Sequence, residues 1–149
     1  MTTYFYGRCS ADENFEKGSS IATQIERANA YAVIHNLKID KEISESISGS
    51  IRFANRPLGL ELMNDLKRDD HIICSALDRF SRNTLDLLQL IEKFKKMKIN
   101  LHFAEFGNVT SSSAMGSVFV KLLSVFAEFY SKQCSEKQSA TKQRMIKEN

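Results

Sequence analysis

The segment YFYGRCS carries the first residues with chemical potential. Its aromatic residues predict a strand from Tyr4, and the strand ends in Arg8, Cys9 and Ser10. Because a strand alternates its faces, Arg8 and Ser10 point to one side and Cys9 to the other. In open α/β sheets, functional sites collect at the carboxyl ends of parallel strands. The sequence therefore predicts a hydroxyl and a guanidinium together at a functional edge.

A second apolar run also ends in charged residues. The run HIICSAL (71–77) predicts a buried strand, and Asp78, Arg79 and Arg82 follow it in DRFSRN. Arg79 and Arg82 are three residues apart and would share a face if a helix begins there. Arg56 stands directly before Pro57, after a polar segment. We expect these side chains to gather with Ser10 at one edge of the sheet.

A serine among several guanidiniums indicates a phosphoryl target. Like charges repel, and each guanidinium is best satisfied by a carboxylate or a phosphate. The chain has no GxxxxGK[ST] loop and no Asp/Glu cluster typical of magnesium sites, so we expect arginines, and no metal or cofactor, to stabilise the developing charge. The three histidines fall in a predicted helix or at strand positions and are interpreted as structural; they are His35, His71 and His102. Asp78 or an arginine-lowered serine pKa could activate Ser10.

Composition and charge are those of an ordinary globular chain with a basic end. The 149 residues are 42% hydrophobic and 26% charged, and no apolar run approaches the roughly 20 residues of a membrane span. The three cysteines form no CxxC pair and are interpreted as buried, reduced thiols of a cytosolic protein. Residues 132–149 hold five basic and two acidic residues, against a net charge of +3 for the chain. The basic positions are Lys132, Lys137, Lys142, Arg144 and Lys147. They suit contact with a polyanion, and equally a cationic helix end that complements the helix dipole.

Predicted strands and helices alternate along the first 106 residues. Strands are expected at 3–9, 38–43, 70–77 and 99–106, and helices at 19–37, 57–68 and 83–96. Ser19 or Ser20 is the expected first N-cap, and residues 44–57 are expected to form a mobile loop. The apolar spacing in the first helix comprises Ile21, Ile25, Ala28, Ala32 and Val33, and that in the third comprises Leu87, Leu90, Ile91 and Phe94. This order predicts an α/β fold with a mostly parallel sheet flanked by helices.

The last segment predicts one long helix from about Ser113. Its apolar stripe comprises Met115, Val118, Phe119, Leu122, Val125, Phe126 and Phe129. Beyond Tyr130 polar and basic residues take over. A helix of this length overhangs a small domain, so its first half should be covered by its own domain or by another subunit. We divide the chain into an α/β part at 1–112 and a long helix at 113–149.

Five motifs together resemble the serine recombinase family of resolvases, invertases and large serine integrases. They are YGRCS, SSIATQ, SGSIRFANRPLGLELM, IICSALDRFSRN and TSSSAMGS…FAEF, in the family's order and approximate spacing from Tyr4 to about Gln143. The resemblance implies that Ser10 attacks a DNA phosphodiester and forms a 5′-phosphoserine link. It further implies a phosphate-binding set of Arg8, Arg56, Arg79 and Arg82, with Asp78 in the LDR motif and Gln24 in the SLxxQ helix. No metal or nucleotide is implied, because the phosphoserine conserves the bond energy.

The resemblance also implies partners and a setting. Members act on double-stranded DNA as dimers and tetramers, here through a helix at 114–134 whose distal half would cross the minor groove. A cytoplasmic protein of a prokaryotic mobile element or phage is expected, with a DNA-reading domain that this chain lacks. Tyr130 and Ser131 replace the acidic and basic pair common in this helix, and RPLGL carries one residue more than the usual RPGL. The alternatives are a catalytically idle DNA-binding or regulatory module on the same fold, or a small-molecule phosphatase or nucleotide-binding protein.

Overall fold

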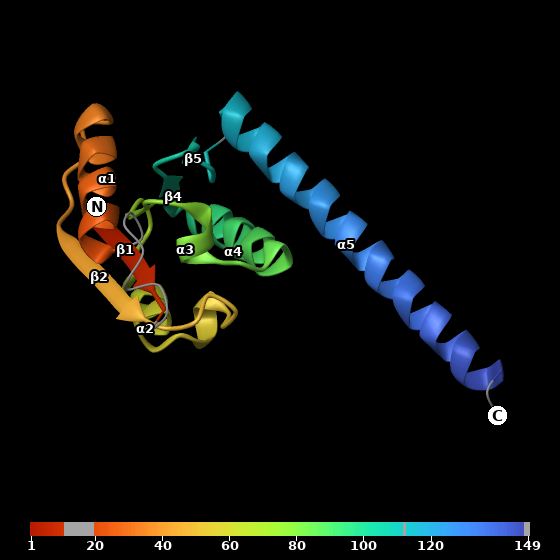
Figure 1. Ribbon diagram of the computed structural model, residues 1–149. Helices are drawn as coiled ribbons and strands as arrows, with labels where there is room; N and C mark the ends of the chain where they lie inside the picture. The colour runs from red at the N-terminus through yellow and green to blue at the C-terminus, as the bar shows by residue number, and fades with distance from the viewer. Residues whose placement is uncertain (11–19, 112, 148–149) are drawn as a thin grey trace.

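A five-stranded sheet with helices on both faces carries one long helix that leaves the domain (Figure 1). The computed structural model describes residues 1–10, 20–111 and 113–147, with side chains as far as residue 142. The strands are β1 (Thr3–Cys9), β2 (Lys41–Ser46), β3 (His71–Cys74), β4 (Asn100–Phe103) and β5 (Gly107–Asn108). Their order is β2-β1-β3-β4-β5, and all neighbours are parallel except β4 and β5. The predicted mostly parallel α/β sheet is confirmed.

The helices begin where the sequence supplies caps. They are α1 (Ile21–Ile34), the 3₁₀ turn η2 (Phe53–Asn55), α2 (Pro57–Asp65), α3 (Leu77–Phe80), α4 (Thr84–Met97) and α5 (Ala114–Lys147). The Ser20 hydroxyl accepts a hydrogen bond from the Thr23 amide at 3.2 Å and caps α1. Asn83 caps α4 in the same way, by accepting from the Asp86 amide at 2.9 Å. Pro57 opens α2, where a missing N–H costs nothing.

The strand β1 is buried on both faces, which explains its run of aromatic residues. Tyr4 and Tyr6 pack into the larger core beneath α2 and α4, whereas Phe5 packs with Ala28 and Ile73 in a smaller core beneath α1. A strand in the middle of a parallel sheet needs apolar side chains on both sides. The predicted stripe of α4 is buried at every position: Leu87, Leu90, Ile91 and Phe94.

Several predicted boundaries and faces are wrong. The strand expected at 70–77 stops at Cys74, because α3 begins at Leu77, and the strand expected at 99–106 stops at Phe103 before turning back as β5. The strand expected at 38–43 lies at Lys41–Ser46 instead. The expected mobile loop contains η2, whose Phe53 is fully buried. Val33, assigned to the buried face of α1, is 76% exposed.

The helix α5 presents most of its apolar stripe to solvent. It packs on its own domain through Leu123, which is buried, and through the partly buried Phe119 and Val120. The exposed members are Met115, Val118, Leu122, Val125, Phe126 and Phe129. The coverage expected from its own domain is thus limited to one narrow face. By length and composition, Ala114–Lys142 also qualifies as a membrane span, which the sequence analysis did not expect.

Candidate active site

The site is built where three parallel strands end together. In the sheet register Cys9 lies beside Ser46, and the Ile47 amide donates to the Cys9 carbonyl at 2.8 Å. The loop after β2 is therefore delivered to the point where β1 ends, directly before Ser10. On its other side β1 pairs with β3, and α1 and α2 lie on opposite faces of the sheet. Such a reversal of winding opens a crevice at the carboxyl edge.

Ser10 follows β1 at this edge and is half-buried. Arg8, two residues earlier, is fully buried. Its Nη1 donates to the Ile47 carbonyl at 2.9 Å and its Nη2 to the Asp78 carbonyl at 3.3 Å. These bonds tie the end of β1 to the loop after β2 and to α3. The cation is thus fixed in place before any ligand arrives.

Gln24 of α1 holds the backbone of Arg8 from behind. Its side-chain Oε1 accepts from the Arg8 amide at 3.2 Å, and its Nε2 donates to the Arg8 carbonyl at 2.9 Å. Gln24 is buried, so both bonds are shielded from water. In this geometry Gln24 positions the end of β1.

Arg56 is also fully buried and reaches across the same edge. Its Nε donates to the Ile51 carbonyl at 3.0 Å, and its Nη1 donates to the Tyr6 hydroxyl at 3.0 Å and to the Arg79 carbonyl at 3.3 Å. Arg56 is the N-cap of α2, and the next four residues of the RPLGL motif form the first turn of this helix. Arg56 therefore stays at the edge of the sheet. The extra residue in this motif therefore leaves Arg56 among the other arginines.

Tyr6 and Glu45 complete this buried network, and the sequence analysis missed both. The Tyr6 hydroxyl donates to Glu45 Oε1 at 2.5 Å, and Glu45 Oε2 accepts from the Leu58 amide at 3.3 Å. Burial, followed by the bond to Glu45, raises the pKa of Tyr6 above its ordinary value. The Glu45 carboxylate thus balances the buried Arg56 charge through the phenol. A signal existed, because Tyr6 shares a strand face with Arg8 and a buried phenol needs a partner.

Asp78 and Arg79 form an ion pair at the mouth of the site. Arg79 Nη2 lies 2.8 Å from Asp78 Oδ2, with side chains 12% and 51% exposed respectively. Arg79 Nη1 also donates to the Arg8 carbonyl at 3.5 Å. Arg82 lies beyond α3, which ends at Phe80, so the expected shared helix face of Arg79 and Arg82 is wrong. Tertiary contact, rather than helix periodicity, brings Arg82 to the site.

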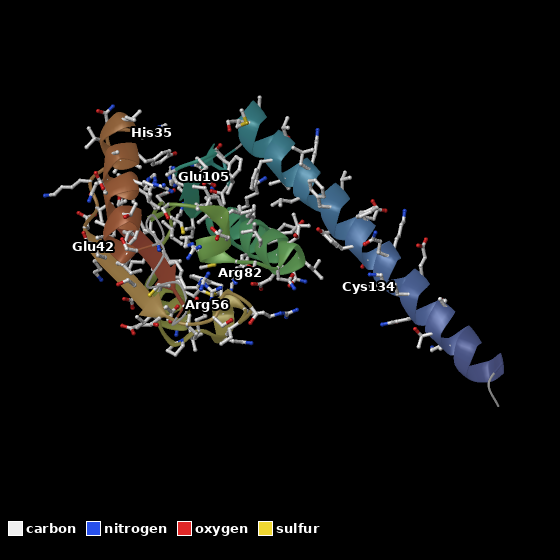
Figure 2. All side chains as sticks on the ribbon, viewed as in Figure 1. His35, Glu42, Arg56, Arg82, Glu105 and Cys134 are labelled. Atoms are coloured by element: carbon white, nitrogen blue, oxygen red, sulfur yellow. The ribbon has the colours of Figure 1, made fainter. Side chains whose placement is uncertain are left out.

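Arg82 closes the set from the solvent side. It is exposed and lies against Gly49 of the loop after β2. An open hollow of about 650 Å³ lies beside it and is lined by Leu77, Asp78, Ser81, Arg82, Glu105 and Phe106. Figure 2 shows Arg56 and Arg82 near each other at the lower edge of the domain, with His35 at the far end of α1. The structure brings Arg8, Arg56, Arg79 and Arg82 to one edge.

The histidines lie elsewhere in the fold. The His102 ring makes two hydrogen bonds. Its Nδ1 lies 3.0 Å from the Tyr31 hydroxyl, and its Nε2 lies 2.8 Å from His71 Nδ1. Burial first, and then the nearby His71 and His35, lower the pKa of His102 to about 3. His35 stacks on the Tyr31 ring at 4.2 Å. All three therefore have structural surroundings on the α1 side of the sheet.

The cysteines divide into two environments. Cys9 and Cys74 are buried and free, and burial raises the pKa of the Cys74 thiol to about 12. Cys134 is exposed on α5, so the expectation of three buried thiols is wrong for this one. Within the described ranges, His, Cys, Asp and Glu side chains form no group of three suited to a metal ion. The described side chains at this edge supply a hydroxyl, guanidiniums and the Asp78 carboxylate.

The predicted basic positions of α5 lie on the distal half of this helix. Lys132, Lys137 and Lys142 are exposed along the distal half of the helix (Figure 1). Lys132 Nζ lies 3.7 Å from Glu128 Oε1, one turn earlier. Arg144 and Lys147 belong to α5, but their side chains lie outside the described residues. The alternative cap Ser19 also lies outside them.

Comparison with known families decides how this arrangement is classed. The family model of the resolvase N-terminal domain matches residues 3–149. The chain belongs to this family. Family members among the curated relatives are named resolvases and serine recombinases of bacteria. The family resemblance inferred from the motifs is confirmed.

Two relatives and two solved structures illustrate the range of similarity. The Tn2501 transposon resolvase of Escherichia coli is 30% identical over 72% of this chain and 55% of its own length. The Tn917 transposon resolvase of Enterococcus faecalis is 30% identical over 83% of this chain and 59% of its own. The N-terminal catalytic domain of TP901-1 integrase is 30% identical, with a TM-score of 0.73 over 89% of this chain and 98% of that one. A resolvase-family site-specific recombinase from Streptococcus pneumoniae, 22% identical, shares the fold at a TM-score of 0.73 over 99% of each chain.

The coverage is uneven between the two kinds of match. The chain spans little more than half of these two curated resolvases but nearly all of the integrase catalytic domain.

Proposed function

We propose that this chain is the catalytic part of a site-specific DNA recombinase and that Ser10 is its nucleophile. The Ser10 oxygen attacks a backbone phosphorus, the bond from phosphorus to O3′ breaks, and a 5′-phosphoserine link remains. The proton lost by Ser10 balances the proton gained by the departing 3′-hydroxyl. Religation is the reverse reaction on an exchanged strand, so no external energy source is needed.

The observation that carries this proposal is the convergence of arginines beside the end of β1. Arg8 and Arg56 are buried and bonded to neighbouring carbonyls, so their charges are already oriented. Preorganised cations stabilise the charge that develops on phosphate oxygens in the transition state without reorganising during the reaction. Arg79 and Arg82 extend the set toward solvent, where a DNA backbone would approach. Asp78 holds Arg79 in that position through the 2.8 Å ion pair.

The helix α5 supplies the features expected of an oligomer and DNA element. Its exposed stripe repeats at three- and four-residue spacing, which suits packing against a second helix of the same kind. The same part of α5 also carries the charged residues Lys121 and Glu128. Because charged side chains are costly within a bilayer, this favours a protein partner over lipid. We assign residues 113–149 to dimer and tetramer contacts at 114–134, followed by a basic stretch that neutralises DNA phosphates. Residues 1–112 form the catalytic part, and the bacterial relatives favour action in the cytoplasm.

The test is a comparison of Ser10→Ala with the unchanged full-length protein. Both are incubated with supercoiled plasmids that carry the DNA flanking the coding region, and the reactions are quenched in detergent. The unchanged protein should leave covalent protein–DNA adducts, and Ser10→Ala should leave none while retaining DNA binding in a gel-shift assay. Adducts that persist in Ser10→Ala would exclude Ser10 as the nucleophile. DNA binding without adducts in either protein would favour the idle module on the same fold.

A further inference from the structure

The loop 47–51 lies directly on the arginine set. Three alternate carbonyls of this loop accept from guanidiniums: Ile47 O from Arg8 Nη1 at 2.9 Å, Ile51 O from Arg56 Nε at 3.0 Å and Gly49 O from Arg56 Nη2 at 3.5 Å. These carbonyls form a frame around the cations, because each hydrogen bond fixes the position of a guanidinium. Gly49 is the middle residue of this frame, and its carbonyl makes the longest of the three bonds.

The backbone of Gly49 leaves no room for a side chain toward Arg8 and Arg82. A Cβ built at Gly49 would lie 2.8 Å from both Cδ and Nε of Arg82 and 2.9 Å from Nη2 of Arg8. Carbon atoms do not approach other heavy atoms this closely without displacing them. Among the glycines that the structure describes, Gly107 has a left-handed φ of 84° and Gly49 does not. Gly49 is thus required for space and not for backbone conformation.

The two arginines differ in how easily they would move. Arg8 is fully buried, with both terminal nitrogens bonded to carbonyls, whereas Arg82 is exposed. A methyl group at position 49 would therefore displace mainly Arg82, while Arg8 Nη2, at 2.9 Å from the built Cβ, would have to shift slightly as well. The three nearest atoms that this methyl group would meet belong to side chains and not to backbone.

We propose that Gly49 is a positioning residue that sets where the Arg82 guanidinium meets a phosphate. This inference rests on the proposed function of the site. The missing side chain lets the loop 47–51 close onto Arg8 and Arg82 together, so that two cations converge on one point. Any side chain at position 49 separates them.

The experiment is a double-mutant cycle in the full-length protein. Gly49→Ala, Arg82→Ala and the combined variant are assayed for covalent adducts on the plasmids described above, with Ser50→Ala as the control. Ser50 is exposed in the same loop. A displacement of about 1 Å in a positioned group costs roughly 100-fold in rate, so Gly49→Ala should slow adduct formation by about that factor. The combined variant should be no slower than Arg82→Ala alone, because both changes act through one guanidinium.

A folding defect would give a different pattern from a displaced arginine. Gly49→Ala should melt within about 2 °C of the unchanged protein, since that shift corresponds to a small fraction of the folding free energy. Two results would overturn the inference. One is an unchanged rate of adduct formation in Gly49→Ala. The other is a rate loss in the combined variant equal to the product of the losses in the two single variants.

A second measurement separates this inference from the proposed function. Arginine Nε–Hε signals are recorded by NMR during titration with inorganic phosphate, and Arg82 is assigned by its loss in Arg82→Ala. Gly49→Ala should shift the Arg82 signal and weaken its phosphate response at least about tenfold, a change that corresponds to one lost charge-assisted contact. If the unchanged protein forms no adducts, the proposed function fails, and this titration still decides the role of Gly49. An Arg82 signal and phosphate response identical to those of the unchanged protein would exclude the positioning role.

Discussion

Arg56 donates through Nη1 to the Tyr6 hydroxyl at 3.0 Å, and both side chains are fully buried. The Tyr6 hydroxyl directs its own proton toward Glu45 at 2.5 Å, so a carboxylate balances the buried cation at one remove. A buried charge without such compensation costs several kcal/mol, because it has lost its hydration. The phenol therefore has a role in holding Arg56 at the edge of the sheet, beyond its packing against Phe53 and Phe80.

Tyr6→Phe should destabilise the fold and slow cleavage together. The ring still packs, but Arg56 loses an acceptor and Glu45 loses its donor, which costs about 1–3 kcal/mol of unfolding free energy. Urea unfolding measures the first effect, and adduct formation on plasmid DNA measures the second. Tyr4→Phe is the matched control on the same face of β1. Equal stability and activity in Tyr6→Phe and Tyr4→Phe would show that the phenol bond carries neither.

Gln24→Met should weaken the hold on Arg8 while keeping the buried volume. The substitution removes the bonds at 3.2 Å and 2.9 Å to the Arg8 amide and carbonyl. The Arg8 amide loses the Gln24 acceptor, and the Arg8 carbonyl loses the Gln24 donor but keeps the 3.5 Å bond from Arg79 Nη1, so unfolding free energy should fall by about 1–3 kcal/mol. Adduct formation should fall as the end of β1 shifts. Gln89→Met is the control, because Gln89 is exposed on α4. If Gln24→Met leaves unfolding free energy and adduct formation unchanged, Gln24 does not position the end of β1.

Local signals predicted the elements of this fold well. The alternation of apolar runs with capped helices predicted a mostly parallel α/β sheet, and Ser20, Asn83 and Pro57 mark helix starts in the structure. These signals are local because caps and φ restrictions act within one turn. The arginines could be found because Arg8 lies near the end of β1, and Arg79 and Arg82 follow the apolar run that contains β3.

Interactions between distant segments were not predictable in the same way. Glu45 and Tyr6 meet only because β1 and β2 pair in a register that no single segment encodes. The exposed stripe of α5 and the exposed Val33 have helical spacing, but spacing does not state which surface covers a face. The sequence predicts only that Gly49 lies in a loop. The space available at Gly49 depends on Arg82, which lies 33 positions further along the chain.

Leu122→Glu should weaken self-association without unfolding the monomer. Leu122 is 54% exposed, between Val118 and Val125 on the free stripe of α5. An apolar side chain of this size contributes roughly 1.5–3 kcal/mol when it becomes fully buried, so a charge there should weaken the dimer at least about tenfold. Sedimentation equilibrium measures the association, and the melting temperature of dilute monomer should not change. Ser124→Glu is the control, because Ser124 is exposed and lies off the apolar stripe. An unchanged dimer in Leu122→Glu would place the contact elsewhere.

Acidification should destabilise the protein through the His71–His102 pair. Burial lowers the pKa of both rings in the folded state, that of His102 from 6.5 to about 3. The unfolded chain binds protons below pH 6.5 that the folded chain refuses, so the stabilisation is complete above that pH and is lost as the pH falls toward 3. His102 should lower the unfolding free energy by up to about 1.4 kcal/mol per pH unit in this window, and His71 adds to the loss in the same direction. Urea unfolding at about pH 7, 6 and 5 measures the slope, which should shrink in His102→Gln and persist in His35→Gln. A slope that is the same in all three proteins would assign the acid sensitivity to other groups.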